Sequence, residues 1–200
     1  MLLSRISFAA FSLVVGLSVS LLALEPNQSE YLALSPGDHW IMIVVLTDPS
    51  GRIERSVLNR KNETEVEKNG KTYVPVKSWV EGGPDLIPFT KLYRKDAKGL
   101  YSIVGDEMEQ LEIPLPMQPG STWKREEEKV VLTEIVIGIE TVTIGEQTYE
   151  KCVHIQSKAD NGSYREDFWE APKVGRVKSE NVKSNGVKIT STLQAYKPAK

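Results

Sequence analysis

Cysteine and histidine are scarce in this sequence: among its 200 residues, only Cys152, His39 and His154 are of these types. One cysteine cannot form a disulfide within the chain, and a structural zinc site needs about four cysteine or histidine ligands. A lipoprotein would need a cysteine directly after its first apolar segment, and this sequence has none there. The sequence therefore predicts no disulfide framework, no metal site and no lipid-modified N-terminus.

An excess of positive charge is also lacking. Lys and Arg number 25 and Asp and Glu number 27, which gives a formal net charge of −2. Nucleic-acid-binding domains concentrate basic residues on one face or segment, so we expect no nucleic-acid partner. The sequence also contains no Gly-x-Ser-x-Gly, no phosphate-binding loop and no dinucleotide-binding glycine motif. We therefore expect a protein without enzymatic activity and without a cofactor.

The one long apolar run is at the N-terminus. Arg5 is followed by residues 6–24 without a charged side chain, and Ala23 lies just before a polar segment. A basic start, an apolar stretch and a small residue at its end are typical of a secretory signal peptide. We therefore predict that residues 1–24 are a signal peptide and that residues 25–200 form a single exported domain, periplasmic or extracellular. The alternative is an uncleaved N-terminal membrane anchor, because the run is close to the shortest that spans a bilayer as a helix.

Amphipathic helix patterns are nearly absent beyond this run. Short segments rich in Val, Ile, Thr, Tyr and Trp alternate instead with turn residues, as at 39–47 before Asp-Pro-Ser-Gly and at 99–105 after Asp-Ala-Lys. Asn-Gly pairs at 69–70, 161–162 and 185–186 are strong hairpin signals. We therefore predict an all-β fold of about ten to twelve strands, almost all antiparallel.

The motif Pro-Gly-x-x-Trp occurs twice, at residues 36–40 and 119–123. Each copy is followed by a predicted hairpin, a Thr-Tyr pair after a glycine-containing turn, an aromatic strand and a glycine. Proline and glycine favour a turn, and the tryptophan can then start a strand and anchor it in the core. We infer two related meanders, about residues 31–112 and 113–196, that form one curved antiparallel sheet, a half-barrel or β-clam. Coincidence is the alternative, because identities are sparse.

Three segments of the second half carry a resemblance to a known family: 114–123 (PLPMQPGSTW), 143–155 (TIGEQTYEKCVHI) and 167–178 (DFWEAPKVGRVK). They resemble exported bacterial domains of the TapB-like kind, whose sheets are broadly similar to the β-clams of periplasmic lipoprotein carriers. The matching residues are Pro116, Gly120, Trp123, Tyr149, Cys152, Val153, Trp169, Ala171, Pro172, Val174, Gly175 and Val177. The resemblance implies a fold and an envelope location but no defined activity, and the first half fits it more loosely.

Aromatic residues lie mostly on predicted strands or at their starts. The candidates for a functional role are Trp40, Trp79, Tyr93, Trp123 and Trp169. They either fill the core or line a groove on a concave sheet face, where they could hold an acyl chain or an apolar peptide. Both alternatives stay open from the sequence.

Cys152 and His154 are the one pair that suggests nucleophilic chemistry. Positions i and i+2 of a strand share a face but stand about 7 Å apart. That separation is too long for the hydrogen bond that an activated cysteine requires. The favoured interpretation is a buried cysteine beside a histidine on a half-buried strand, and the alternative, from strand alternation, is a cysteine that is only partly covered. We expect Cys152 to react slowly and neither residue to have a catalytic role.

Carboxylates are numerous, and Glu166 and Glu170 share a face of one predicted strand. A carboxylate pair could serve glycoside hydrolysis, but basic residues lie among the acidic ones, so we expect solvated cross-strand ion pairs. The charged run 124–129 (KREEEK) is predicted to be a solvated strand edge.

Together these features predict a non-catalytic binding or interaction module of the bacterial cell envelope, with a lipid or another apolar ligand held on a concave sheet face. The first alternative is a structural component that docks with an envelope protein through an edge strand. A hydrolase is the third hypothesis. Contact with a membrane is expected only if the N-terminal segment stays uncleaved.

Overall fold

The computed structural model describes residues 27–81, 88–104, 108–127 and 129–199. The predicted signal peptide, residues 1–24, lies outside the described residues. The described chain consists of strands and a single-turn 3₁₀ helix, η1 (Gln28–Tyr31). None of its helical segments is long and apolar enough to cross a membrane.

Both halves of the chain form successive strands. The first half contains β1 (His39–Thr47), β2 (Ile53–Asn62), β3 (Val66–Lys68), β4 (Lys71–Glu81), β5 (Phe89–Asp96), β6 (Gly99–Val104) and β7 (Met108–Pro114). The second half contains β8 (Thr122–Glu127), β9 (Val130–Ile144), β10 (Gln147–Ala159), β11 (Tyr164–Ala171), β12 (Gly175–Lys183) and β13 (Lys188–Lys197). The predicted turns at Asp-Pro-Ser-Gly and at the three Asn-Gly pairs lie between consecutive strands, and the Asp-Ala-Lys turn joins β5, whose last residue is Asp96, to β6, which confirms these turns.

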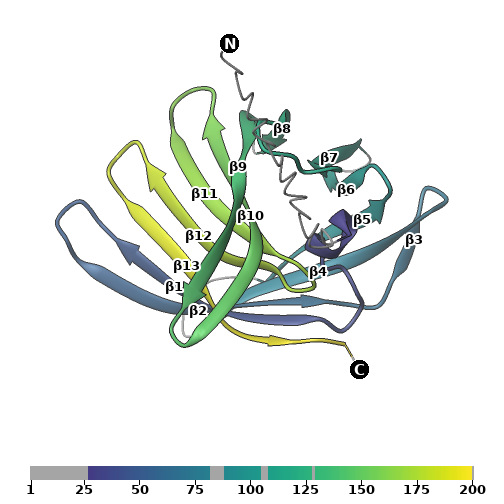
Figure 1. The fold of residues 1–200 in the computed structure, drawn as a ribbon, viewed down its shortest axis with the longest axis horizontal. Helices are drawn as coiled ribbons and strands as arrows, with labels where there is room; N and C mark the ends of the chain where they lie inside the picture. Colours follow the sequence, from purple (N-terminus) through teal and green to yellow (C-terminus); the bar gives the residue numbers. More distant parts are fainter. Residues whose placement is uncertain (1–26, 82–87, 105–107, 128, 200) are drawn as a thin grey trace, which may run out of the picture.

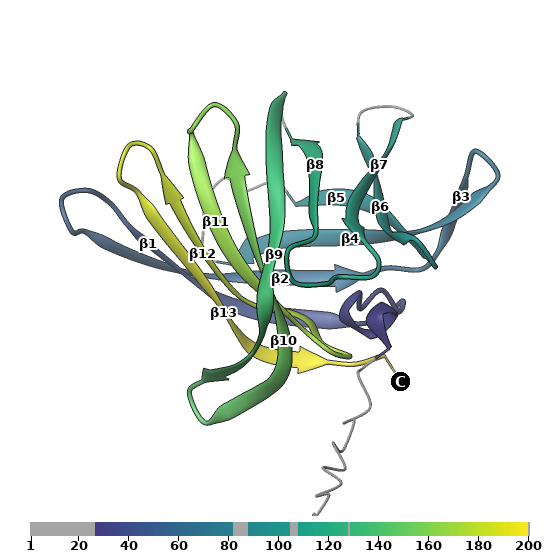
Figure 2. The same cartoon turned by 45° about the horizontal axis from the view of Figure 1, so that its top comes forward.

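The strands form one antiparallel sheet in the order β7-β6-β5-β4-β2-β1-β13-β12-β11-β10-β9-β8, and β3 pairs with β4 beside this path. The two halves join where β1 pairs with β13. The sheet rolls up until its outermost strands, β7 and β8, face each other (Figures 1 and 2). The fold is therefore an all-β, nearly closed barrel with one seam, which confirms the predicted curved antiparallel sheet.

Side chains bridge the seam between β7 and β8. The Gln110 side-chain amide on β7 donates to the Glu126 carbonyl at 2.9 Å and accepts from the Glu126 backbone N–H at 2.7 Å. The Trp123 indole on β8 donates to the Glu112 carbonyl at 2.8 Å. The side-chain amide of Gln110 thus makes the two hydrogen bonds that the backbone of a residue in an antiparallel strand would make. The two edges of the sheet are therefore hydrogen-bonded to each other at this point.

The two Pro-Gly-x-x-Trp motifs adopt the same turn. In each, the N–H of the residue after the glycine closes a four-residue turn, at 3.1 Å in the first motif and 2.9 Å in the second. Gly37 and Gly120 have φ values of 95° and 86°, as a type II turn with proline before the glycine requires. Each turn leads into the first strand of its half, so the motif starts a strand as predicted.

The surroundings of the two turns also match. Gly37 donates to the carbonyl of Asn62 on β2 at 2.9 Å, and Gly120 donates to that of Val136 on β9 at 2.8 Å. The N–H groups of Asn62 and Val136 donate back to the residue after each glycine, both at 2.9 Å. Each turn is therefore held by the second strand of its own half, which is the local arrangement that a two-fold structural repeat implies. An ancestral duplication stays a prediction.

Buried apolar side chains form two clusters. One contains Tyr31, Leu32, Ile113, Met117, Val136, Val153, Ile155 and Phe168. The other contains Trp40, Met42, Val142, Cys152, Trp169, Ala171, Val177 and Leu193. The Tyr31 hydroxyl donates to the Lys151 carbonyl at 2.8 Å, which ties η1 to β10. Helix η1, the purple turn in Figure 2, thereby packs against one end of the rolled sheet.

Candidate functional site

The concave face of the sheet surrounds a cavity of about 410 Å³. Because side chains alternate across a strand, residues two apart line the same wall. The lining follows this rule on strands of both halves: Trp40, Met42 and Val44 on β1, Leu58 and Arg60 on β2, Val76 and Ser78 on β4, Phe89, Lys91 and Tyr93 on β5, Glu166, Phe168 and Glu170 on β11, and Ile189 and Ser191 on β13. Small-molecule sites in proteins have volumes of about 300–1,000 Å³, so the cavity can admit a ligand of that kind.

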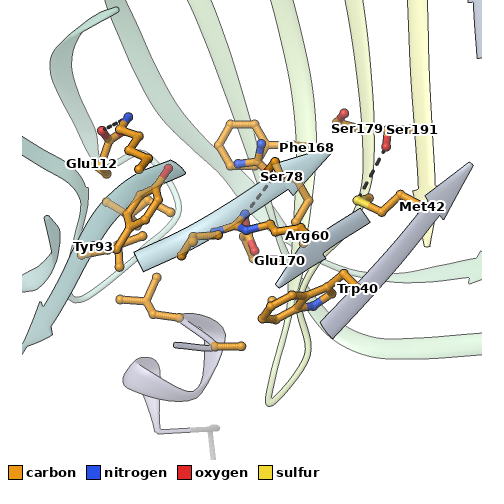
Figure 3. Close-up of a pocket in the computed structure, with 18 of the residues that line it drawn as sticks. Trp40, Met42, Arg60, Ser78, Tyr93, Glu112, Phe168, Glu170, Ser179 and Ser191 are labelled. Carbon is orange, nitrogen blue, oxygen red and sulfur yellow. Dashed lines mark hydrogen bonds and ion pairs between the residues drawn. The ribbon is translucent and has the colours of Figure 1, made fainter. Parts of the chain in front are cut away.

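Part of the cavity wall is apolar and aromatic. Trp40 and Met42 project from β1 and Tyr93 from β5 (Figure 3). The Trp40 indole N–H donates to the Val174 carbonyl at 2.6 Å, which holds the ring in place with its polar atom satisfied. Phe89 lines the cavity yet is 62% exposed, so it lies at an opening of the cavity to solvent.

Another part of the wall carries ion pairs between neighbouring segments of the sheet. Lys91 Nζ lies 2.7 Å from Glu112 Oε1, and the Ser102 hydroxyl also donates to that carboxylate. Arg125 Nε on β8 lies 2.7 Å from Glu134 Oε1 on β9. These charges neutralise one another, which is the condition for burying them at tolerable cost.

The two buried carboxylates of these pairs respond differently to their surroundings. Burial opposes the ionisation of Glu112, but Lys91, Ser102 and Arg125 together hold its pKa below the usual value. Burial raises the pKa of Glu134 above the usual value, although Arg125 acts against this rise. Its Oε2 is buried and has no hydrogen-bond partner within the described part of the chain. Glu134 is thus the less fully compensated of the two.

Arg60 differs from the other cations of the wall. Its guanidinium carbon lies 5.6 Å from the ring centroid of Trp40 and 5.6 Å from that of Tyr93 (Figure 3). Across residues 27–81, 88–104, 108–127 and 129–199 it pairs with no carboxylate, and its Nε is buried without a hydrogen-bond partner. The other three cations of the wall each hold a carboxylate. Arg60 therefore brings an uncompensated positive charge to an aromatic part of the cavity.

The five aromatic residues predicted for the core or a groove have different positions. Trp40 and Tyr93 line the cavity. Trp79 stacks on His39 with ring centroids 5.7 Å apart, and Trp123 bridges the seam. Trp169 is buried and stacks on His154 with centroids 4.5 Å apart. These last three tryptophans are not among the described residues that line the cavity.

The sequence analysis missed several residues of the wall, above all Tyr31, Arg60 and Phe168. Phe168 stands between Glu166 and Glu170 in the alternating pattern of β11, so all three face the same way. That alternation was readable, but it does not say which face is concave. Arg60 could have been found from the pairing of β1 with β2. In this pairing Arg60 lies directly opposite Trp40, so the two side chains share one face of the sheet.

Cys152 and His154 do not form a reactive pair. Cys152 is fully buried, as the favoured interpretation predicted, and not partly covered as strand alternation suggested; burial raises the pKa of its thiol to about 11. A bulge between Tyr149 and Cys152 breaks the regular alternation on which that expectation rested. The His154 ring instead contacts Asp167 through Nε2 at 3.0 Å and Glu140 through Nδ1 at 3.2 Å. Among the described residues, no group of three or more His, Cys, Asp or Glu is arranged to hold a metal ion.

The predicted solvated ion pairs are only partly right. Glu166 and Glu170 share a face and approach Arg176 on β12, at 3.9 Å and 3.1 Å, so the cross-strand pairing is as expected. These two glutamates were expected on the solvent-exposed surface, but both line the cavity and Glu170 is only 6% exposed. In the run 124–129, the Arg125 side chain is likewise only 12% exposed. Rolling of the sheet turns one face of each strand, including the edge strand, toward the interior.

The fold and the cavity define a class of protein: a rolled antiparallel sheet around an internal ligand-sized space. Two solved structures share this fold. A candidate exported protein with a YmcC-like fold from Bacteroides fragilis has a TM-score of 0.55 and 14% identity, and the match covers 82% of this chain and 97% of that one. A candidate lipoprotein from Parabacteroides distasonis has a TM-score of 0.52 and 13% identity, with 84% and 98% covered. No family model and no curated protein matches the sequence.

Proposed function

We propose that this protein is a non-catalytic binding module of the bacterial cell envelope that holds an apolar ligand in the cavity of its rolled sheet. The observation that carries the proposal is the cavity of about 410 Å³, lined on one part by Trp40, Met42, Leu58 and Tyr93. A concave, partly open space of this size, with aromatic and aliphatic residues on part of its wall and a few polar groups on the rest, is typical of a small-molecule site.

An acyl chain suits the apolar part of this wall. Each buried methylene group contributes about 0.8 kcal/mol, and micromolar affinity corresponds to about 8.2 kcal/mol, so a chain of about ten or more buried methylenes supplies that affinity without any specific polar contact. An alkyl chain that enters the cavity would contact the exposed ring of Phe89 at the opening. The candidate aromatic residues Trp40 and Tyr93 then belong to the site, while Trp79, Trp123 and Trp169 support the fold.

The proposed location rests on sequence and fold together. Residues 1–24 have the pattern of an export signal, and the two similar solved folds belong to a candidate exported protein and a candidate lipoprotein. The TapB-like resemblance is not confirmed, since no family model matches the sequence, and the proposed location does not rest on it. We propose a periplasmic or extracellular protein, with a membrane-bound form only if the N-terminal segment is retained.

The absence of catalysis is also proposed from the arrangement of the charges. Three carboxylates of the wall, Glu112, Glu134 and Glu170, each lie in an ion pair with Lys91, Arg125 or Arg176, and such structural pairs do not require a role in proton transfer. The thiol of Cys152 is buried and has a raised pKa, which removes the nucleophile.

The alternative of a structural component that docks through an edge strand is less well supported. β-Strand addition needs an open edge with free backbone groups. The end strands β7 and β8 face each other and are bridged through Gln110 and Trp123. A strand that added at this seam would first have to displace these contacts.

Thermal unfolding with and without an alkyl ligand tests the proposal. Dodecanol and dodecanoate are suitable probes, each below its solubility or micelle limit. A bound ligand at about 100 times its Kd stabilises by about 2.7 kcal/mol, which corresponds to an upward Tm shift of roughly 5–11 °C for a chain of this size. We expect at least one of the two compounds to produce such a shift.

A cavity-filling variant makes this test specific. Ser191 on β13 lines the cavity beside Met42, so Ser191→Phe should occupy part of the space and abolish the ligand-dependent shift. Gln194→Phe places the same ring at an exposed position of the same strand and should leave the shift unchanged. No shift with either compound, or equal shifts in both variants, would contradict the proposal.

A further inference from the structure

Arg60 is the one cation of the cavity wall whose charge the described residues leave uncompensated. A guanidinium carries five N–H donors and is always protonated. Leaving a charged or polar donor buried without an acceptor is unfavourable, because the donor loses its hydrogen bonds to water and gains none in return. The Nε of Arg60 is buried and has no acceptor in the described part of the structure. A donor of this kind inside a ligand-sized cavity is explained if a ligand supplies the missing acceptor.

The aromatic neighbours of Arg60 hold the guanidinium without using its donors. Its central carbon lies 5.6 Å from the rings of both Trp40 and Tyr93, and cation–π attraction acts through the ring faces. The N–H groups in the guanidinium plane remain available for an acceptor that enters the cavity. The side chain is therefore positioned in advance, which lowers the entropy lost on binding.

Other positions on the wall do not suit an anion. Lys91, Arg125 and Arg176 each hold a carboxylate of the protein, so an incoming anion would have to displace an existing ion pair. Glu170 is drawn beside Arg60 in Figure 3, but its carboxylate is held by Arg176 at 3.1 Å. Arg60 is thus the cation that an anionic group can reach without breaking a pair.

We infer that the ligand is an anionic amphiphile whose carboxylate or phosphate group binds Arg60 while its alkyl chain lies along the apolar wall near Met42 and Leu58. This inference rests on the proposed function, since it specifies the ligand class of the same cavity. Planar guanidinium groups bind carboxylate and phosphate through two parallel hydrogen bonds. The chain supplies most of the affinity, and Arg60 selects for the charged head group.

The test compares alkyl compounds that share a chain and differ in the head group. Dodecanoate, dodecyl phosphate and dodecanol are titrated by calorimetry into protein expressed from the full-length gene and purified with its bound lipid removed. Inorganic phosphate alone is included as a control for binding of the head group without a chain. Dodecanoate and dodecyl phosphate together distinguish a fatty-acid ligand from a phosphate-bearing lipid.

We expect the anionic compounds to bind at least about tenfold more tightly than dodecanol, as a hydrogen-bonded charge contact would give. Arg60→Gln should remove about ten- to a hundredfold of the affinity for the anionic compounds and leave dodecanol binding unchanged. Arg60→Lys should recover part of the loss because it keeps the charge. Arg55→Gln removes an exposed charge from the same strand and should change none of the affinities.

Two results would overturn the inference. The first is equal affinity of the unmodified protein for dodecanol and for both anionic compounds. The second is an equal loss for dodecanol and dodecanoate in Arg60→Gln, which would show a structural role for the arginine. If Arg60→Gln does not fold, arginine side-chain NMR of the unmodified protein decides: the Arg60 Nε–H signal should move on addition of dodecanoate and not of dodecanol, and an unmoved signal contradicts the inference.

The failure of this inference is distinguishable from failure of the proposed function. If dodecanol binds as tightly as dodecanoate and Ser191→Phe blocks both, the cavity binds apolar ligands without selecting a charge. If none of the compounds binds, the proposed function itself is wrong.

Discussion

Replacing Trp123 with alanine should destabilise the fold strongly, because this side chain joins the two ends of the sheet. The ring packs against the buried cluster that contains Ile113 and Met117, and its N–H donates to the Glu112 carbonyl at 2.8 Å. Truncating a tryptophan in a core costs about 3–5 kcal/mol. Since Trp123 is only partly buried, we expect about 2 kcal/mol from the ring and about 1 kcal/mol from the hydrogen bond, about 3 kcal/mol in all.

Urea unfolding followed by circular dichroism measures this change without relying on tryptophan fluorescence. The Tm should also fall by roughly 6–12 °C for a chain of this size. Trp123→Phe keeps most of the packing and loses the donor, so it should cost about 1 kcal/mol. Trp79→Ala, which removes a ring stacked on His39, should also cost only about 1 kcal/mol. If the free energy of unfolding of Trp123→Ala lies within about 0.5 kcal/mol of the parent's, Trp123 does not hold the seam together.

Two further predictions concern titratable groups. Burial raises the pKa of the Cys152 thiol to about 11, so this thiol should be labelled at neutral pH more slowly than the thiol of a free-cysteine peptide. The substitution His154→Ala should not change the labelling rate. Fast labelling that depends on His154 would restore the hypothesis of a reactive pair. Glu109 has a pKa lowered to about 2, chiefly by its hydrogen bond to Arg94, with Lys71 also contributing. Its ionised form therefore stabilises the folded state above pH 4.5, and this contribution is lost as the pH falls from 4.5 to about 2. Acid unfolding of Glu109→Gln should show a weaker pH dependence in that window than the parent, and an unchanged profile would show that this carboxylate is not held as described.

Local structure was largely predictable from the sequence because its signals are local. The Asn-Gly turns place residues with positive φ where a hairpin requires them, as at Asn69 and Gly70, with φ values of 53° and 70°. The Pro-Gly-x-x-Trp motif likewise encodes a type II turn in two residues. Strands between such turns follow from alternation and β-propensity.

Closure of the sheet was not predictable in detail, because it depends on contacts between distant residues. Nothing local indicates that β1 pairs with β13 or that Gln110 bridges to Glu126. The prolines at 114 and 116 also suggest an irregular connector, yet β7 extends to Pro114. Proline is tolerated there because β7 is an end strand of the sheet.

The cavity was also not predictable from the sequence, because it too depends on how distant strands come together. Alternation places Glu166, Phe168 and Glu170 on one face but does not say that this face is concave. Charged residues were expected in solvent because most are, whereas here the closed sheet turns Arg125 and Glu170 inward and pairs them. Arg60 could be recognised as a candidate ligand-binding residue only from the three-dimensional structure, which shows that it pairs with no carboxylate among the described residues.

Native mass spectrometry of the protein purified from the cells that make it tests the central claim most directly. We predict that the protein carries a small molecule with an acyl chain and an anionic group, released on denaturation. The same molecule should be retained by Gln194→Phe and lost from Ser191→Phe, because only the second substitution occupies the cavity. Recovery of the unmodified protein without any bound small molecule, or with a second protein in its place, would contradict the account.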